Sequence, residues 1–477
     1  MQAAFELPEG TSQWIELVSG NRVLAMKRHV ARREAWVIDT ETSKGKKIQY
    51  FLRIDRSGLK GRGGPWSLAR ETKIIQALES TAVPAQIIYA WDDERQLALQ
   101  QMVPGKGELD QVPPDQQQAV FKDFLDSLAE LHKLDPNALG ISDVCDWPVT
   151  PADHALSEVR IIESLWQSMP APNTVSRLFS AFGSRWLENH VPQEINHTVL
   201  VQGDTGPANF MFEGNKVTAF VDWELAHIGD PMEDLGNIVV RDFFYPSSGG
   251  NLQPLFEYYE NVSGIKVDNA KVKYYTVQQL LRSVMSLMYT VSNLKWHDEV
   301  AMNMGYEINC QRAMCDAIAR SMNISHDLSL SNSGMPAAVI DVAEKHQGNG
   351  AQKSGSQTLF ALAIDQLKEQ IQPALDDTYI KHRATHTTAM IEYLARLDCY
   401  GDVLDNFEVN QIEQLMGLSF SGLLEAEDAL LERIENMSAE QDEKAILAYL
   451  YARAYRLEDL MEPLVRPFAN RALAVID

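Results

Sequence analysis

The sequence predicts an α+β protein with a small β-rich lobe, a larger helical lobe and, after them, an all-α bundle. Short aromatic and β-branched runs at 34–39 and 47–53 flank a segment of turn-forming residues, a pattern typical of paired strands. From 104 to 326, and again from 358 to 477, apolar residues recur at helical spacing. Strands therefore gather near the N-terminus, whereas helices fill most of the remainder.

The expected elements follow one another in a simple order. After the two strands come a helix over 66–79, a strand over 97–103 that a Pro-Gly pair ends, and a helix over 115–134 that two prolines precede. Residues 197–223 are typical of a hairpin. Further helices are expected over 153–168, 174–190, 230–245, 268–294 and 298–324.

These elements divide the chain into four predicted parts. The β-rich lobe covers 1–103 and the helical lobe covers 104–326. Residues 327–357 are rich in Ser, Gly, Asn and Gln, a composition that predicts a flexible linker. The helical pattern of 358–477 predicts a separate bundle that is long enough to fold by itself.

Composition restricts the class of protein. Of the 477 residues, 45% are hydrophobic and 23% are charged, which is enough apolar material for several cores and too much for a disordered chain. No apolar run approaches the ~18 residues of a membrane helix, and the N-terminus lacks the regions of a signal peptide. The four cysteines form no CxxC pair. We therefore expect a cytoplasmic protein in a reducing compartment.

The charge is strongly acidic overall, with one basic segment. The net charge of −24 disfavours nucleic acid and anionic membranes as partners. Residues 22–62 depart from this balance, because they include twelve basic and only four acidic residues. This island indicates either a bound small polyanion, such as a nucleotide, or a solvated basic surface.

The most informative segment is 199–223. An apolar strand leads into Asp204, and Asn209 follows five residues later. A Gly-Asn turn at 214–215 then reverses the chain, and a second strand returns to Asp222. In an antiparallel hairpin centred on that turn, Asn209 and Asp222 lie near the same end. We therefore expect two carboxylates and one amide to converge at one rim.

Phosphoryl transfer requires such a set of side chains. Mg²⁺ prefers hard oxygen ligands, which Asp222 and Asn209 would supply, and Asp204 would orient the attacking hydroxyl and accept its proton. The Asp-x-x-x-x-Asn spacing with a later Asp matches the catalytic loop of kinases. Taken singly, Asp204 and Asn209 are equally typical of a turn and Asp222 of a cap at a strand end. The three together favour the chemical interpretation.

Two segments resemble the aminoglycoside phosphotransferase family, which are small-molecule kinases with a two-lobed, protein-kinase-like fold. The segments are 202–209 (QGDTGPAN) and 221–235 (VDWELAHIGDPMEDL). The second is similar to the branch that includes kinase domains attached to some acyl-CoA dehydrogenases. The resemblance covers roughly 10–320 and is most specific over 198–235.

This resemblance assigns roles to the residues of the hairpin. It implies that Asp204 is the catalytic base, that Asn209 and Asp222 are Mg²⁺ ligands, and that ATP is the phosphate donor. It also implies that Asp230 braces the catalytic loop. An N-cap before Pro231 at the first helical position explains Asp230 equally well.

The resemblance also implies nucleotide contacts in the N-lobe. Arg53 would lie against the phosphates and pair with Glu71 on a helix; the alternative is an exposed surface ion pair. Gln101, within 100–103, falls where a hinge between the lobes would hold adenine through backbone groups. A core strand explains 100–103 nearly as well.

Three features depart from the family pattern. The first loop is usually rich in Gly and Ser, but here Arg32 and Arg33 stand where glycine would let the backbone approach a phosphate. These arginines either bind the phosphate in place of the glycine-rich backbone or weaken ATP binding. Gln202 replaces a His that mainly scaffolds the loop, and Gly206 stands where the branch often has a basic residue.

A second candidate metal site lies in the C-terminal part. His382 and His386 are spaced to share a helix face, as metal ligands do. Because no carboxylate or cysteine nearby in the sequence completes an obvious site, a solvated helix face is the favoured interpretation.

Together these observations predict a cytoplasmic, ATP- and Mg²⁺-dependent kinase of a small hydroxyl substrate, for which the resemblance suggests a hydroxyacyl-CoA or another catabolic alcohol. The alternatives are an antibiotic-type phosphotransferase and a pseudokinase-type module that binds a nucleotide or another anion without transferring phosphate. The 358–477 bundle is a candidate homodimer interface or a cover for the acceptor site, and the sequence leaves both open.

Overall fold

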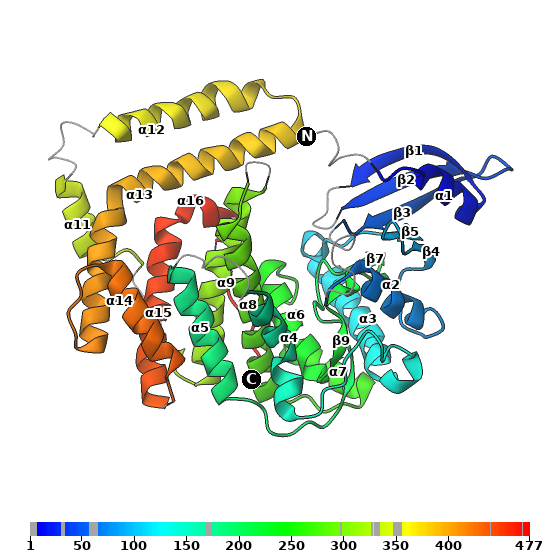
Figure 1. The fold of residues 1–477 in the computed structure, drawn as a ribbon, viewed down its shortest axis with the longest axis horizontal. Helices are drawn as coiled ribbons and strands as arrows, with labels where there is room; N and C mark the ends of the chain where they lie inside the picture. The colour runs from blue at the N-terminus through cyan, green and yellow to red at the C-terminus, as the bar shows by residue number, and fades with distance from the viewer. Residues whose placement is uncertain are drawn as a thin grey trace. The chain divides into compact units, whose positions relative to one another are not determined.

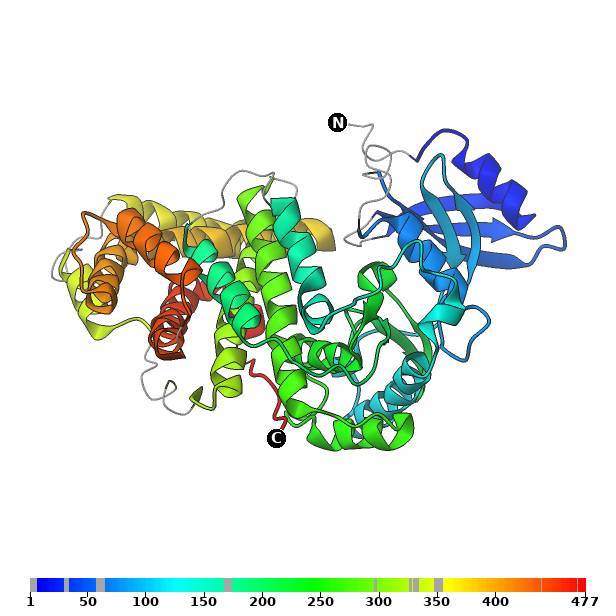
Figure 2. The same cartoon turned by 60° about the horizontal axis from the view of Figure 1, so that its bottom comes forward.

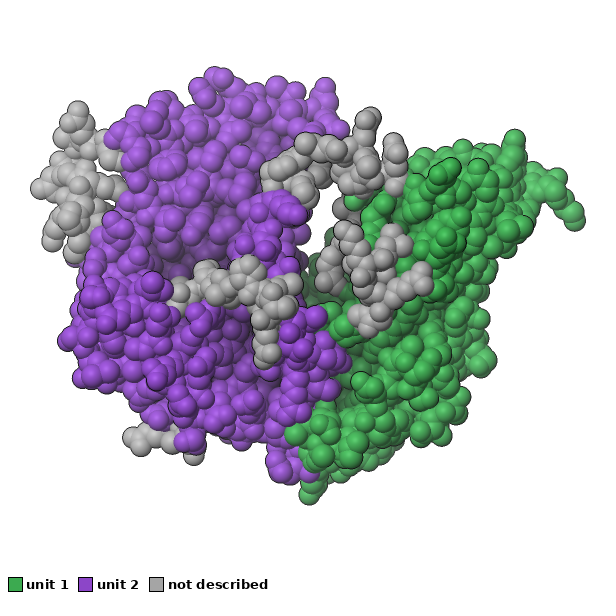
Figure 3. Space-filling model, viewed as in Figure 1, with its two compact units in different colours: residues 1–154, 194–272, 474–477 green, residues 155–193, 273–473 purple. Residues whose placement is uncertain are grey.

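The computed structural model describes most of the chain. The described residues are 7–29, 34–56, 65–166, 174–295, 298–325, 328, 334–346, 355–438, 440–469 and 471–477. They form two compact units (Figure 3). Unit 1 comprises Met1–His154, Glu194–Val272 and Ala474–Asp477, and unit 2 comprises Ala155–Gln193 and Lys273–Leu473. Helices α4 (Pro151–Trp166) and α8 (Asn269–Ser292) run across the boundaries.

Unit 1 begins with an antiparallel five-stranded sheet in the order β1-β2-β3-β5-β4 (Figure 1). Ile38, Leu52 and Leu99 fill its core, and Ile15 of α1 packs against them. The strands and helices expected at 34–39, 47–53, 66–79 and 97–103 are confirmed. These elements are α1 (Thr11–Ser19), β1 (Arg22–His29), β2 (Ala35–Glu41), β3 (Lys47–Ile54), α2 (Leu68–Leu78), β4 (Ile88–Asp92) and β5 (Leu97–Gln101).

The rest of unit 1 combines helices with two small strand pairs. Strand β6 (Val199–Val201) pairs with β9 (His227–Gly229), and β7 (Phe210–Glu213) forms a hairpin with β8 (Lys216–Phe220). Phe124 of α3 stacks on Phe210, with 4.6 Å between ring centroids, and so anchors the hairpin. The helical elements are η2 (Leu109–Gln111), α3 (Pro114–His132), η3 (Pro136–Leu139), η4 (Trp223–Leu225), α6 (Pro231–Phe244) and α7 (Gln253–Ser263).

The described residues of unit 2 form helices joined by loops, with no strand among them. Helices α12 (Gly355–Gln366) and α13 (Thr378–Met416) lie side by side (Figures 1 and 2), and a buried pair between Arg456 and Glu408 ties α15 to α13 at 2.6 Å. The remaining elements are α5 (Thr174–Asn189), α9 (Val300–Ser321), α11 (Ala337–His346), η5 (Leu367–Ile371), η6 (Gln372–Ala374), α14 (Leu423–Glu435), α15 (Glu440–Leu460), α16 (Glu462–Val465) and η7 (Arg466–Phe468).

The compact units do not follow the four predicted parts. Helix α5 packs on α14, and α9 packs on α15, so helices predicted for the second lobe share one unit with the C-terminal bundle. Part of the predicted linker is also helical, because α11 covers Ala337–His346. Val339 on α11 is buried in a cluster with Leu404 of α13. The extent of each compact unit depends on which apolar helix faces are buried against one another, and composition does not specify this.

Among the described residues, no helix combines the length and the apolar character that a membrane span requires.

Candidate phosphotransfer site

The loop after β6 is held by Gln202. Its side-chain amide donates hydrogen bonds to the carbonyl oxygens of Val221 and Asp222, both at 2.9 Å. Its side-chain oxygen accepts a hydrogen bond from the backbone N–H of Asp204, also at 2.9 Å. One buried amide therefore connects the loop that carries Asp204 to the strand end that carries Asp222. The expected scaffolding role of position 202 is confirmed.

A fully buried carboxylate, Asp234, braces the same loop from α6. It accepts hydrogen bonds from the backbone N–H groups of Gln202 at 2.9 Å and Gly203 at 3.0 Å. His132 Nε2 lies 3.0 Å from it, and the Thr205 hydroxyl donates to it as well. Burial alone would raise the pKa of Asp234, but the hydrogen bonds and charge of His132 and the other donors hold that pKa below its usual value.

Asp230 does not brace the loop in the way that the resemblance implied. Its side chain caps α6 by accepting a hydrogen bond from Met232 N–H at 3.0 Å, and it pairs with Lys271 at 3.1 Å. Asp230 is thus the N-cap that precedes proline at the first helical position. The bracing carboxylate lies one helical turn further along, at Asp234, because that turn faces the loop backbone.

The hairpin brings Asn209 and Asp222 to one end, as predicted. Phe210 pairs with Phe220, and the Val221 N–H donates to the Asn209 carbonyl oxygen at 3.0 Å. Asn209 Nδ2 donates to the Asp204 carbonyl oxygen at 2.6 Å, which fixes the orientation of the amide. Asp222 adopts a left-handed backbone, with φ 58° and ψ 62°. This conformation is uncommon for a non-glycine residue.

Arg53 connects β3 to both α2 and the hairpin. Its guanidinium lies 2.8 Å from Glu71 and 3.0 Å from Asp222. The Arg53 and Glu71 side chains are buried, so the alternative of an exposed ion pair is wrong. Burial alone would lower the pKa of Arg53, but the charges of Glu71 and Asp222 raise it. The Asp222 side chain remains 48% exposed.

Arg241 is a site residue that the sequence did not reveal. From α6 its guanidinium donates to the Asn209 side-chain oxygen at 3.1 Å, and Nη1 lies 3.6 Å from the Asp204 carboxylate. Gly206 makes room for this side chain, because a Cβ atom there would lie 2.8 Å from Arg241 Cβ. The φ of Gly206 is also +136°, a conformation that disfavours other residues.

The glycine at 206 was the only sequence signal for this arrangement. It showed that the loop lacks the basic residue that the branch often has at this position. It did not indicate which helix would supply a cation instead.

The donor set fits a magnesium ion. Asn209 presents an amide oxygen, which accepts one hydrogen bond from Arg241, and Asp222 presents a half-exposed carboxylate. Both are hard oxygen donors of the kind that Mg²⁺ prefers, and few protein ligands suffice because this ion retains water.

The remaining nucleotide candidates are less informative. Gln101 ends β5, and both its N–H and its side-chain oxygen bond to the backbone of Ile87, at 2.8 and 3.3 Å. These contacts fit the core-strand interpretation, so its role in adenine binding stays a prediction. Arg32 and Arg33 lie outside the described residues.

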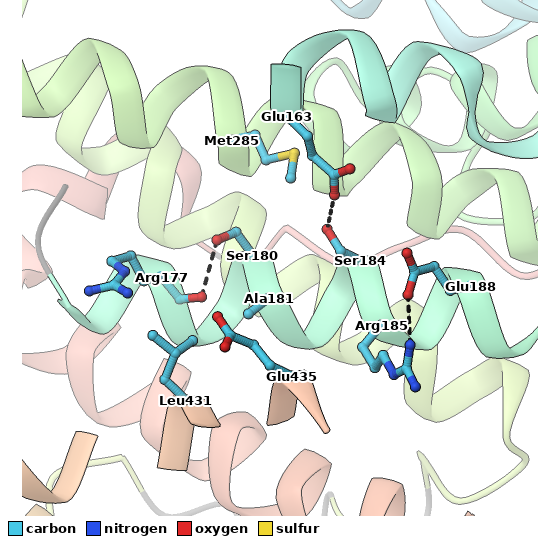
Figure 4. A pocket seen from close by; sticks show the side chains of 10 residues that line it. All are labelled: Glu163, Arg177, Ser180, Ala181, Ser184, Arg185, Glu188, Met285, Leu431 and Glu435. Carbon is cyan, nitrogen blue, oxygen red and sulfur yellow. Dashed lines mark hydrogen bonds and ion pairs between the residues drawn. The ribbon is translucent and has the colours of Figure 1, made fainter. Parts of the chain in front are cut away.

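An open pocket of about 320 Å³ lies in unit 2 (Figure 4), and none of the residues described above lines it. Ser184 on α5 donates to Glu163 on α4 at 2.9 Å, and Arg185 pairs with Glu188 at 3.0 Å. Leu431 and Glu435 of α14, among others, close its other side. None of the residues predicted for phosphotransfer lines it, and we assign it no ligand.

Comparison with known families decides the classification. The model of the phosphotransferase enzyme family matches residues 31–270, just over half of the chain. The chain belongs to this family. This family membership confirms the resemblance seen at 202–209 and 221–235, the enzyme class and the kinase-like α+β fold.

Curated relatives of this chain come from the predicted branch. Acyl-CoA dehydrogenase family member 11 of Rattus norvegicus is 30% identical over 142 residues, which are 28% of this chain and 17% of that protein. Acyl-CoA dehydrogenase family member 10 of Mus musculus is 26% identical over 196 residues, 38% of this chain and 17% of the relative. The matches thus span less than a quarter of the length of these relatives.

Solved phosphotransferases also match. A putative aminoglycoside phosphotransferase from Ralstonia eutropha is 18% identical, with 67% of this chain and 98% of that chain covered and a TM-score of 0.47. A thermostable mutant of aminoglycoside phosphotransferase APH(4)-Ia, in a ternary complex with ADP and hygromycin B, is 16% identical, with coverages of 65% and 98% and a TM-score of 0.46. Macrolide 2'-phosphotransferase MphH from Brachybacterium faecium is 17% identical, with coverages of 58% and 90% and a TM-score of 0.40.

Proposed function

We propose that this phosphotransferase is an ATP- and Mg²⁺-dependent kinase that transfers the γ-phosphate to the hydroxyl group of a small molecule. The observation that carries the proposal is the convergence of Asp204, Asn209 and Asp222 on a loop and hairpin braced by buried groups. A loop that existed only as a turn would not require the buried brace of Gln202 and Asp234.

Asp204 has the properties of the base. Its carboxylate is partly exposed, so a hydroxyl substrate can approach it, while its backbone is fixed on both sides. The substrate oxygen forms a bond to the γ-phosphorus, the bond from that phosphorus to the bridging oxygen of ADP breaks, and the hydroxyl proton passes to Asp204. The carboxylate thus orients the nucleophile and removes its proton.

Asn209 and Asp222 would hold the magnesium ion. When bound, the ion neutralises charge on the phosphates. Arg53 fixes the Asp222 carboxylate at 3.0 Å and places a positive charge beside the phosphate position, and Glu71 holds that guanidinium from α2. The contacts expected from Arg32, Arg33 and Gln101 belong to the same proposal.

The acceptor is a hydroxyl compound, for which we propose a hydroxyacyl-CoA or another catabolic alcohol. The support is the similarity to acyl-CoA dehydrogenase family members 10 and 11. An antibiotic-type acceptor and a pseudokinase-type module without transfer are the competing outcomes of the test. We place the activity in the cytoplasm, and we retain a homodimer through the C-terminal helices as part of the proposal.

The proposal is tested with the tag-free full chain and two variants. Mg·ATP should raise the melting temperature more than ATP with EDTA, because a ligand that binds only the folded state stabilises it. Asp204→Asn should keep this shift but lower turnover of a hydroxyl substrate, identified by ATP consumption in a compound library, by roughly 10²–10⁴-fold. Asp222→Ala should lose the Mg²⁺-dependent part of nucleotide binding in calorimetry.

A matched control is Asp143→Asn, which removes an exposed carboxylate paired with Lys73 and should change neither property. Near-normal turnover by Asp204→Asn, or unchanged Mg·ATP affinity of Asp222→Ala, would refute the assigned roles. Binding of Mg·ATP without consumption in the presence of any hydroxyl compound would favour the pseudokinase-type module.

A further inference from the structure

Unit 2 contains a cluster of metal-ligating side chains that the phosphotransfer proposal does not use. His382 and His386 lie one turn apart on α13, with ring centroids 4.0 Å apart. The sequence showed no carboxylate near them, but the fold supplies one. Glu299, at the N-terminus of α9, approaches both rings. The two histidines thus share a carboxylate neighbour, although the His382 side chain is half-exposed.

The three ligand atoms converge on one place. Glu299 Oε2 lies 3.1 Å from His386 Nδ1 and 3.5 Å from His382 Nε2, and the three ligand atoms all lie within 4.8 Å of one another. Ligands that bind a tetrahedral ion at 2.0–2.2 Å are separated from one another by about 3.3–3.6 Å. The two histidine–glutamate distances lie close to this range.

The carboxylate is held so that one oxygen faces the histidines. Arg383 lies 3.1 Å from Glu299 Oε1 and also donates a hydrogen bond to the Asp298 carbonyl oxygen at 2.6 Å. Glu299 stands at the N-cap position of α9, yet its side chain makes no cap hydrogen bond. The helix end therefore does not explain where this carboxylate points.

We propose that Glu299, His382 and His386 form a binding site for a divalent transition metal ion of the zinc class, with water completing the coordination. Two imidazole nitrogens and one carboxylate oxygen suit Zn²⁺ and its neighbours better than Mg²⁺, which prefers oxygen ligands alone. The ion would join the start of α9 to the first turns of α13. Its binding to the folded state would stabilise unit 2.

The simpler alternative is a hydrogen-bonded cluster in which the histidines donate to Glu299 without any metal. The two interpretations differ in what they predict for added metal. A metal site binds one ion with an affinity that depends on all three side chains, whereas the hydrogen-bonded cluster binds none specifically.

The test uses the tag-free full chain, stripped with EDTA and kept in excess Mg²⁺ so that oxygen sites are filled. Zn²⁺ is titrated by calorimetry, and Co²⁺ is added in parallel to record ligand-field absorption. We expect the chain to bind one equivalent of Zn²⁺ with a micromolar dissociation constant, and its melting temperature to rise. The Co²⁺ absorption bands should be those of a low-coordinate site with nitrogen and oxygen ligands. The His382→Ala/His386→Ala double variant and Glu299→Ala should each lose this equivalent.

The matched control is His190→Ala. His190 is a partly exposed histidine that faces a single carboxylate, Glu443, at 3.5 Å, so its loss should leave Zn²⁺ binding unchanged. Asp222→Ala should also retain the Zn²⁺ equivalent, which separates this site from the proposed magnesium site. Equal Zn²⁺ stoichiometry and affinity in the wild type and the double variant, or no binding by the wild type, would overturn the proposal.

Discussion

Arg241 is the residue whose position most changes the chemical interpretation of the site. Its guanidinium touches both the side-chain oxygen of Asn209 and the carboxylate of Asp204. The proposed ion uses that same Asn209 oxygen, so the arginine places a positive charge beside the proposed ion. We therefore expect Arg241 to weaken magnesium binding in the free enzyme.

We predict that Arg241→Met lowers the Mg²⁺ concentration needed for half-maximal Mg·ATP binding. Two effects act in the same direction, since the variant removes both a competing hydrogen bond and a nearby positive charge. A charged hydrogen bond is worth about 1.5–3 kcal/mol, which sets an upper limit of roughly a hundredfold on the change. Titration of Mg²⁺ at saturating ATP, followed by calorimetry, measures the effect.

The control for this prediction is Lys73→Met, which removes an exposed cation paired with Asp143. An increase in the required Mg²⁺ concentration for Arg241→Met, with the control unchanged, would mean that the arginine supports the ion instead of competing with it.

At the scale of elements, the loop from 202 to 209 depends on α6 and α3. Asp234 accepts hydrogen bonds from two backbone N–H groups of the loop, and His132 of α3 lies 3.0 Å from the same carboxylate. Tyr259 of α7 contacts the second nitrogen of His132 at 2.7 Å. Three helices thus hold one strand-to-hairpin connection, which explains how a loop without regular structure presents Asp204 in a fixed position.

We predict that Asp234→Asn destabilises the protein at neutral pH by roughly 3 kcal/mol, since it removes a buried, hydrogen-bonded charge. The pKa of Asp234 is lower in the folded than in the unfolded state. Its contribution is therefore fully present above the unfolded value, about 3.9, and is lost as the pH falls through the lower folded value. Melting curves of both proteins from pH 7 to pH 3 measure the difference.

The stability gap between the wild type and Asp234→Asn should stay constant down to about pH 4 and narrow below it. A gap that persists unchanged into stronger acid, or the absence of any gap at pH 7, would contradict the role given to the charged carboxylate.

At the scale of the whole molecule, α12 and α13 expose unusually many large apolar side chains. Leu359 is 68% and Leu362 is 53% exposed, and α12 has no buried residue among those described. Ile371 of η5 and Ile380, Leu394 and Leu397 of α13 are also exposed. Such a face is typical of an interaction surface, and a second copy of the chain is the occupant that we predict.

We expect light scattering after size exclusion to give a dimer, with a mass near twice 53.6 kDa. The Leu359→Lys/Leu362→Lys variant should shift the species to the monomer, because like charges would face each other across a symmetric interface. Leu17→Lys is the control, since Leu17 is 82% exposed on α1 in unit 1. A monomeric wild type at every concentration would contradict the prediction.

The sequence predicted what depends on short separations along the chain. Strands at 34–39 and 47–53 and the hairpin ending at Asp222 follow from local alternation and turn residues, so their positions agree with the structure. The pairing of Arg53 with Glu71 followed from family resemblance and is also present. The division into lobes and bundle stays a prediction; the compact units group α5 with α14 and α9 with α15, because a helical pattern shows which face is apolar but not which helix covers it.

The sequence by itself therefore determined the family, the order of the elements and the near approach of Asn209 to Asp222, since a tight turn leaves these two little freedom. Only the tertiary structure decided that Arg241 faces Asn209 and Asp204, that Asp234 and not Asp230 braces the loop, and that Glu299 meets His382 and His386. Each of these contacts joins residues from different packed elements. Packing of whole helix faces, and not local chain geometry, brings such side chains together.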